Sequence, residues 1–301
     1  MKKISILLPS LKGGGAERAM INLANGFIKK GHKVNLILIS ASGTYLNDIS
    51  PLVKIFDLKK TRVLSGLFGL IRYLRVNKPD ILLSAMAHVN AVALLAKIFS
   101  RTKAKIIVSD RSSTSVAAGY KQRFSSIILN YVNRYLYNYA DIVNANSYGV
   151  ANSTSKRLGI KYDQIKVIYN PVVTDKLIKM SEETVEYNWL PVDDKHLIVS
   201  AGRLTEAKDF STLIRAFSRM YKCSNARLLI LGEGELRKDL ETLIFQLGLI
   251  DHVIMPGFIK NPFALIKKAN LFVLSSAWEG LPNSLIEAMA CGTPVVSTNC
   301  P

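Results

Sequence analysis

Short apolar runs alternate with amphipathic segments along most of this chain. Residues 4–8, 34–39 and 81–84 are brief and almost continuously apolar, which is typical of strands buried on both faces of a parallel sheet. Residues 17–29 and 148–158 repeat apolar positions at helical spacing. Further strands are predicted at residues 53–58, 105–109, 142–146, 165–168, 197–201, 228–231, 253–255, 271–274 and 294–297. Further helices are predicted at residues 64–76, 90–99, 122–137 and 283–291.

This alternation is interrupted once, where Asn170-Pro171 begins a polar stretch of about two dozen residues without clear periodicity. We therefore expect two domains in series, residues 1–170 and residues 171–301. Repeated strand–helix units favour an α/β fold in which each domain is a doubly wound parallel sheet with helices on both faces. Ligands of such sheets bind at the carboxyl ends of the strands, so we expect two of these edges to face each other across a cleft.

Composition limits the class of protein. With 301 residues and 49% hydrophobic residues, the chain can build sizeable cores and is not predicted to be disordered. Its three cysteines form no CxxC pair, which disfavours a disulfide scaffold and suits a reducing cytoplasm. No apolar run reaches the ~18 residues that span a bilayer. We expect a protein that is soluble or peripheral to a membrane.

The positive charge is concentrated in the first domain. Residues 1–180 carry 28 Lys and Arg against 8 Asp and Glu, whereas residues 181–301 carry 12 against 14. A basic surface of this kind attracts nucleic acid and anionic lipid equally well, so charge alone does not choose between these partners.

A glycine-rich loop follows the first predicted strand. Gly13, Gly14 and Gly15 allow the backbone to approach a ligand closely and to direct N–H groups at a phosphate or sugar oxygen. The loop is not a dinucleotide fingerprint, because Arg18 stands where the third glycine of G-x-G-x-x-G belongs. A plain tight turn is the alternative interpretation.

Loops at the strand ends of the second domain carry a second set of candidate residues. Gly202 and Arg203 end one strand, and Lys208 follows five residues after Arg203. A planar guanidinium that binds bidentately and a lysine point charge together suit a diphosphate, although solvated surface residues are the alternative. Gly232 and Phe258 lie in similar loops after the next two strands, so these loops are predicted to form one rim.

The stretch of residues 275–287 (SSAWEGLPNSLIE) connects a strand to the helix at residues 283–291. Glu279 and Glu287 bracket the turn that contains Gly280 and Leu281. A helix N-terminus behind such a turn suits an anion, and the two carboxylates suit sugar and ribose hydroxyls. An ordinary strand-to-helix connection with two surface glutamates is the alternative.

Three of these motifs together resemble the retaining glycosyltransferases of family 4, which have the GT-B fold of two Rossmann-like domains. They are residues 13–18 (GGGAER), Gly202-Arg203 with Lys208, and Glu279-x7-Glu287, and the resemblance covers essentially the whole chain. It implies a nucleotide-sugar donor, more often a UDP-sugar than a GDP-sugar among bacterial surface-polysaccharide relatives. It implies no cofactor and no metal ion, and the sequence has no compact Asp-x-Asp motif.

The resemblance also implies roles for individual residues. Arg203 and Lys208 would neutralise the donor diphosphate, Glu279 would contact the transferred sugar, and these three form the predicted catalytic set. Glu287 would hold the ribose. The predicted donor-binding residues are Gly14, Gly15, Gly202, Arg203, Lys208, Gly232, Phe258, Glu279, Gly280, Leu281 and Glu287.

Two features depart from the family pattern. Some relatives have a histidine after an acidic residue in the first domain, and here Arg111 follows Asp110. We expect Asp110, Arg111 and His88 to contribute to acceptor binding, although a structural role is the alternative for His88. The chain also ends just after the strand at residues 294–297, so we expect an incomplete second domain.

The expected function is transfer of a sugar to a lipid-linked or glycan acceptor in bacterial surface-polysaccharide biosynthesis. A nucleotide-sugar-binding protein of the epimerase type is one alternative, and release of UDP only with acceptor would separate the two. A basic nucleic-acid-binding protein is the other alternative. No nucleic-acid partner is expected, because the sequence contains no zinc-ligand or RNP motif.

An anionic membrane surface is the last predicted partner. In residues 58–78, six basic residues flank an apolar centre, which suits a segment lying in the interface at the cytoplasmic face of the cell membrane. A second stretch, residues 120–124 with Arg134, Tyr135 and Tyr137, is predicted to share that face. A core helix with a solvated basic side is the alternative.

Overall fold

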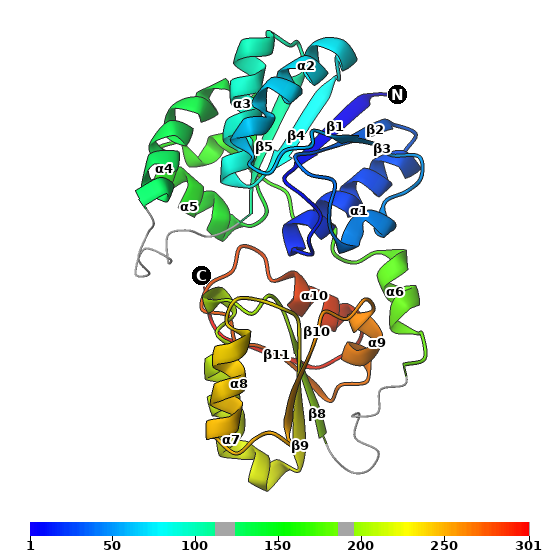
Figure 1. The fold of residues 1–301 in the computed structure, drawn as a ribbon, viewed down its shortest axis with the longest axis vertical. Coiled ribbons are helices and arrows are strands. Elements are labelled where there is room, and N and C mark those ends of the chain that lie inside the picture. The colour runs from blue at the N-terminus through cyan, green and yellow to red at the C-terminus, as the bar shows by residue number, and fades with distance from the viewer. Residues whose placement is uncertain (112–123, 186–195, 301) are drawn as a thin grey trace. The chain divides into compact units, whose positions relative to one another are not determined.

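The chain forms two compact units, Met1–Pro171 and Val172–Pro301 (Figure 1). The structure, a computed structural model, describes residues 1–111, 124–185 and 196–300, and among residues 124–126 only the backbone. Each unit contains one parallel β-sheet with helices on both faces, as the alternation of apolar runs and amphipathic segments predicts.

Seven strands of the described part of the first unit form a sheet in the order β3-β2-β1-β4-β5-β6-β7. Its strands are β1 (Lys3–Leu8), β2 (Lys33–Leu38), β3 (Lys54–Asp57), β4 (Ile81–Ala85), β5 (Lys105–Asp110), β6 (Ile142–Ala145) and β7 (Ile165–Val167). Its helices are α1 (Gly15–Lys29), α2 (Leu67–Asn77), α3 (Ala87–Ser100), α4 (Phe124–Leu136) and α5 (Tyr148–Leu158).

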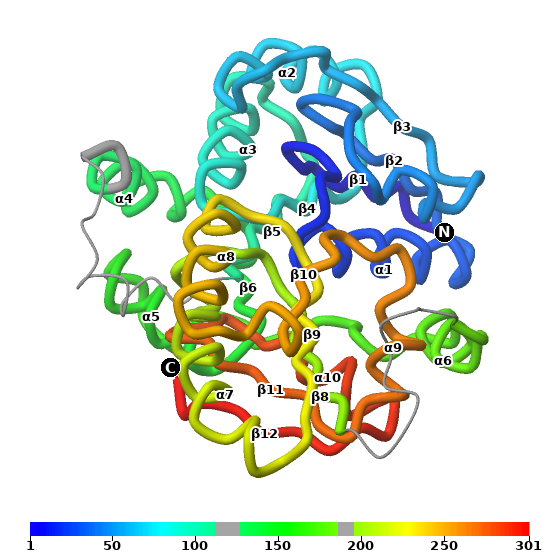
Figure 2. Tube along the Cα trace, turned by 60° about the horizontal axis from the view of Figure 1, so that its bottom comes forward, coloured from blue at the N-terminus to red at the C-terminus, as the bar shows by residue number. Residues whose placement is uncertain are grey.

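Successive residues of β1 enter different cores, which explains why the run is apolar throughout. Ile6 and Leu8 pack with Met20 of α1, whereas Leu7 packs in the core beneath α2 and α3 with Leu70. The helices α2, α3, α4 and α5 pack side by side in that order, and both views place α3 between α2 and α4 (Figures 1 and 2).

Five strands of the described part of the second unit form a sheet in the order β10-β9-β8-β11-β12. Its strands are β8 (His196–Ala201), β9 (Ala226–Leu231), β10 (Val253–Gly257), β11 (Leu271–Leu274) and β12 (Val295–Ser297). Its helices are α6 (Asp175–Ser181), α7 (Phe210–Ser224), α8 (Arg237–Gln246), α9 (Pro262–Lys267) and α10 (Asn283–Ala290). Helices α7 and α8 cover one face and α9 and α10 the other (Figure 1).

Three predicted elements differ from the structure. The helix predicted at residues 64–76 is a 3-10 turn, Leu64–Gly66, followed by α2, and the side chains of Ile39 and Leu58 pack against Gly66. The helix predicted at residues 90–99 begins three residues earlier, in α3. The polar stretch predicted to lack periodicity contains α6, whose N-cap Thr174 accepts a hydrogen bond from Leu177 N at 3.2 Å.

Candidate functional site

In the second unit, the structure brings together the glycine turns predicted at three strand ends. Gly202 N donates to Leu231 O at 2.9 Å, and Gly232 N donates to Gly257 O at 2.9 Å. Gly232 has φ +147°, and a Cβ added there would lie 1.9 Å from Gly202 O. Only glycine fits such an approach, so the loops after β8, β9 and β10 form one close-packed rim.

An ion pair joins two of the predicted catalytic residues. Lys208 ends a 3-10 turn, Glu206–Lys208, and its Nζ binds Oε1 of Glu279, with side-chain exposures of 19% and 17%. The Ser276 hydroxyl donates to the same oxygen at 2.8 Å. The lysine stem lies against Gly202, where an added Cβ would be 2.8 Å from Cε. Glu279 therefore holds the Lys208 ammonium in this structure, and the predicted contact of Lys208 with a diphosphate stays a prediction.

Further hydrogen bonds hold the two loops that carry this pair. The Ser275 hydroxyl donates to Lys208 O at 2.8 Å, and Ala277 N donates to Ala207 O at 2.9 Å. The Thr298 hydroxyl donates to Ser276 O at 2.6 Å. These contacts preorganise the loops after β8, β11 and β12.

Arg203 differs from Lys208 in that its side chain is not paired with another residue in the described part of the chain. Its side chain is exposed, and no hydrogen bond or ion pair joins its guanidinium to another residue in the described part of the chain. The backbone next to it is fixed, since Leu204 N donates to Glu233 O at 2.9 Å. The guanidinium of Arg203 therefore stands on an anchored loop, the same loop after β8 that carries Lys208.

The N-terminus of α10 lies just after Gly280 and Leu281, both half-buried. Its N-cap residue, Pro282, supplies no side-chain hydrogen bond. The Ser284 hydroxyl oxygen is buried and has no hydrogen-bond partner among the residues that the structure describes. A helix end of this kind with an additional hydroxyl suits an anion, and Ser284 was not among the residues predicted from the sequence.

Glu287 and Phe258 occupy different settings. Glu287 is half-buried on α10. Burial of Cys291 and the nearby negative charge of Glu287 together raise the pKa of the Cys291 thiol to about 11. Phe258 follows Gly257 directly and is exposed at the end of β10. Their predicted contacts with ribose and donor stay predictions.

In the first unit, Asp110 is buried at 3% exposure and is bound on both oxygens. Oδ1 accepts from Tyr137 at 2.8 Å and from Asn90 at 3.3 Å. Oδ2 accepts from Thr154 at 3.0 Å and from Arg157 Nη2 at 2.6 Å. Burial and the Asp110 charge raise the pKa of Tyr137 well above its usual range, which keeps it a donor. These contacts suit a structural anchor better than a ligand contact.

The side chains of Arg111 and His88 form no hydrogen bond with that network in the described part of the chain. Arg111 Nη1 donates to Asn170 Oδ1 at 2.6 Å and Nη2 lies 3.8 Å from Met20 Sδ, while burial lowers the pKa of Arg111 to about 10. His88 is exposed in the first turn of α3, where partial desolvation lowers its pKa. Met86, the N-cap of α3 and two residues before His88, has φ +79°, a strained conformation for a non-glycine residue.

A buried carboxylate lies close to the glycine-rich loop of the first unit. Gly15 begins α1, Gly14 is its N-cap, and a Cβ added to Gly14 would lie 2.1 Å from Oε2 of the buried Glu17. This carboxylate already lies at the positive end of the helix, which lowers the attraction of the loop for a second anion. The loop therefore suits a sugar hydroxyl better than a phosphate.

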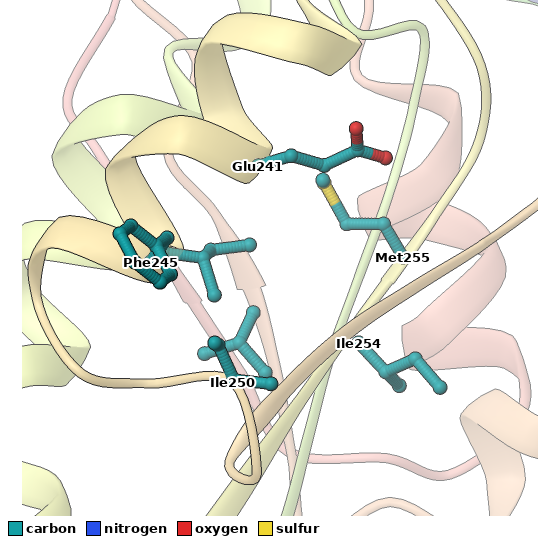
Figure 3. A pocket seen from close by; sticks show the side chains of 7 residues that line it. Glu241, Phe245, Ile250, Ile254 and Met255 are labelled. Atoms are coloured by element: carbon teal, nitrogen blue, oxygen red, sulfur yellow. The ribbon is translucent and has the colours of Figure 1, made fainter.

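An apolar hollow of about 260 Å³ lies on α8 and β10 (Figure 3). Phe245, Ile250 and Ile254 line it, with Glu241 and Met255 at one end. None of the catalytic residues predicted from the sequence lines this hollow.

Neither a membrane-spanning helix nor a metal site occurs among the described residues. None of their helices combines the length and the apolar character that a membrane span needs, and no group of three or more His, Cys, Asp or Glu residues could hold a metal ion.

Two family models match this chain. The model described as Glycosyltransferase Family 4 matches residues 13–176, and the model described as Glycosyl transferases group 1 matches residues 181–301. An uncharacterised glycosyltransferase of Methanocaldococcus jannaschii is 35% identical over 79% of this chain, which spans 60% of that relative. A Campylobacter jejuni N-acetylgalactosamine-N,N'-diacetylbacillosaminyl-diphospho-undecaprenol 4-alpha-N-acetylgalactosaminyltransferase is 29% identical over 99% of this chain and 81% of its own length.

The fold also matches a solved structure. Anabaena HepE, in complex with UDP and glucose, has a TM-score of 0.79 at 21% identity, covering 100% of this chain and 81% of HepE. This likeness confirms the predicted GT-B fold with its two Rossmann-like sheets. Since the first family model alone spans more than half of the sequence, the chain belongs to Glycosyltransferase Family 4.

Proposed function

We propose that this protein is a retaining glycosyltransferase that moves a sugar from a nucleotide-sugar, by preference a UDP-sugar, to a lipid-linked or glycan acceptor of a surface polysaccharide. The observation that carries the proposal is that one loop, the loop after β8, holds both Lys208, which is paired with Glu279, and Arg203, whose guanidinium has no partner among the described residues. Two cations and one carboxylate at the strand ends suit a sugar diphosphate, whose phosphates need positive charge and whose hydroxyls need acceptors.

Each residue then has a defined task. Arg203 and Lys208 bind the diphosphate, and Glu279 binds the transferred sugar next to the amides of Gly280 and Leu281. Glu287 holds the ribose. The UDP and glucose named for the HepE structure support a UDP-sugar as the donor. The diphospho-undecaprenol acceptor in the name of the Campylobacter relative supports a lipid-linked acceptor, which we assign to residues 1–170.

The chemistry follows from these positions. The bond between the sugar carbon and the diphosphate oxygen breaks, and the acceptor hydroxyl oxygen attacks that carbon on the face that the diphosphate leaves. The proton of the acceptor hydroxyl passes to the oxygen of the leaving diphosphate. Negative charge grows on the leaving phosphate oxygens, so fixed cations lower the barrier most at that point. Because Glu279 and backbone hydrogen bonds already hold Lys208, its charge needs little reorganisation during the reaction.

Release of UDP tests the proposal. Incubation with a panel of UDP-sugars and an undecaprenyl-diphosphate-linked sugar should release UDP only when the acceptor is present. NMR of the product should show the anomeric configuration of the donor. Interconversion of UDP-sugars without an acceptor would instead indicate an epimerase.

Glu279→Gln should separate binding from transfer. Removing this carboxylate frees Lys208 for the diphosphate, so we expect UDP to bind about fivefold more tightly, the size of one partly exposed charge pair. Transfer should fall about 10²-fold, because the sugar loses a charged acceptor and faces a neutral amide instead. Titration calorimetry and single-turnover assays measure the two effects. Glu206→Gln, which removes an exposed acid from the same turn, is the control, and weaker UDP binding by Glu279→Gln would contradict the assignment.

We also propose that the outer faces of α2 and α4 lie on an anionic membrane at its cytoplasmic side. Exposed Phe68 (82%), Leu64 and Val76 share the surface of α2 and its preceding turn with the exposed side chains of Arg72 and Arg75. Apolar side chains between basic residues suit the boundary between headgroups and acyl chains.

The α4 surface extends this face. Tyr131 (71%), Ile128 and Tyr135 are exposed on α4, which packs against α3 beside α2. Tyr137 is buried, so its predicted place on this face is wrong. Most of the predicted stretch 120–124 lies outside the described residues; only Phe124, as the first residue of α4, falls within them.

Charge reversal tests membrane binding. Changing Arg72, Arg75 and Lys78 to Glu should lower co-sedimentation with phosphatidylglycerol vesicles more than tenfold, since each basic residue contributes about 1 kcal/mol. Reversal of Lys30, Lys33 and Lys54, which lie outside α2 and α4, is the matched control. Unchanged vesicle binding, or tight binding of duplex DNA with no binding to lipid, would contradict the membrane proposal.

A further inference from the structure

Arg237, the first residue of α8, joins several neighbouring segments through its guanidinium. Nε and Nη2 donate to the two oxygens of Glu233 at 2.8 and 2.7 Å, a bidentate arrangement. Nη1 donates to Glu241 Oε1 at 2.9 Å and to Met255 O at 3.1 Å. The fork of this one side chain therefore binds the loop after β9, helix α8 and strand β10 together. We refer to Arg237 and Glu233 as the clasp.

The clasp lies directly against the end of β10. A Cβ added to Gly257 would be 2.6 Å from Glu233 Oε1, and Gly257 has φ +91°. Gly257 is thus glycine partly because the Glu233 carboxylate occupies the space of a side chain. Gly257 O in turn accepts from Gly232 N at 2.9 Å, which connects the clasp to the strand-end rim.

Hydrogen bonds extend from the clasp to the loop that carries Arg203. Glu233 O accepts from Leu204 N at 2.9 Å, and Leu204 O accepts from Leu236 N at 3.1 Å. A Cβ on Gly234 would be 2.3 Å from Leu204 O, so the two loops are in close contact. Because the Arg203 guanidinium has no partner of its own in the described structure, the anchoring of Leu204 determines where it stands.

We propose that Arg237 is a positioning residue for the donor diphosphate: it fixes the Glu233 loop, which fixes Leu204 and so directs Arg203. This inference rests on the proposed function, because it assumes that Arg203 binds the diphosphate. Arg237 itself touches none of the residues assigned to the donor except Gly232, whose carbonyl lies 3.5 Å from Nη2. The clasp is partly exposed, with side-chain exposures of 26% for Arg237 and 54% for Glu233, so its loss should leave the fold intact.

UDP titration of five variants tests this role. Arg237→Met should weaken UDP binding about five- to tenfold, within the range of coupling between neighbouring residues. Arg237→Lys should not restore binding, because an ammonium cannot form the fork. Lys238→Met removes the adjacent exposed charge and should bind UDP like the wild type. In an Arg203→Ala background, Arg237→Met should have no further effect, since its influence passes through Arg203.

The outcomes distinguish this inference from the proposed function. If Arg203→Ala weakens UDP binding and Arg237→Met does not, the clasp has no positioning role. An equal loss caused by Arg237→Met in the Arg203→Ala background would also overturn it. If Arg203→Ala leaves UDP binding unchanged, the diphosphate assignment fails, and this inference fails with it. Melting temperatures within about 4 °C of wild type would exclude unfolding as the cause of an effect.

Discussion

Arg203→Ala should lower turnover roughly 10²–10³-fold, the usual effect of removing one donor that stabilises charge in a transition state. The guanidinium is exposed, has no partner among the described residues and belongs to the same loop as Lys208. Charge grows on the leaving diphosphate during the reaction, so the loss should appear in kcat as well as in UDP affinity. Steady-state assays of UDP release measure both.

Arg215→Ala provides the matched control for this variant. Arg215 is an exposed arginine on α7, and its removal causes the same change in net charge. It should retain wild-type turnover, and both variants should melt near the wild-type temperature. Wild-type turnover by Arg203→Ala would contradict the assignment of Arg203 to the donor diphosphate.

Asp110→Asn should lower the free energy of unfolding by about 3–5 kcal/mol, the usual cost of breaking a buried ion pair from one side. The carboxylate is bound by Arg157, Thr154, Tyr137 and Asn90, and its substitution leaves the Arg157 charge unpaired in a largely buried position. Urea denaturation measures the change.

Arg157→Met in the Asp110→Asn background should recover part of this loss, because the unpaired charge is removed. A loss below about 1 kcal/mol for Asp110→Asn, as for an exposed pair, would contradict the structural role of the network. Such a result would favour the sequence-based prediction that Asp110 contributes to acceptor binding.

The sequence was sufficient to predict the fold class, because the central strands of both sheets are parallel and buried on two faces. Alternate residues of β1 enter different cores, so the run of residues 4–8 is apolar throughout and is easily recognised. Helix boundaries were less predictable. The helix predicted at residues 64–76 contains Gly66, where tertiary packing by Ile39 and Leu58 accompanies a 3-10 turn.

The candidate site was predictable residue by residue but not as a set of contacts. Glycines at the strand ends predicted turns in which the backbone is closely approached. In the structure, the backbones at Gly232 and Gly202 lie in close contact with each other. The pairing of Lys208 with Glu279 joins residues 71 positions apart, and no local pattern indicates it. The clasp was missed for the opposite reason: Arg237 and Glu233 have the i, i+4 spacing of an ordinary surface pair.

Titration of UDP and GDP into the wild-type protein, Arg203→Ala and Lys208→Met measures whether these two cations hold a nucleoside diphosphate. We expect saturable one-to-one binding of one of these nucleotides by the wild type, with micromolar to millimolar dissociation constants. Both variants should bind that nucleotide about tenfold or more weakly, because each loses a charge-assisted contact with the diphosphate. Absence of binding of either nucleotide by the wild type, or affinities that both substitutions leave unchanged, would show that Arg203 and Lys208 do not bind a donor diphosphate.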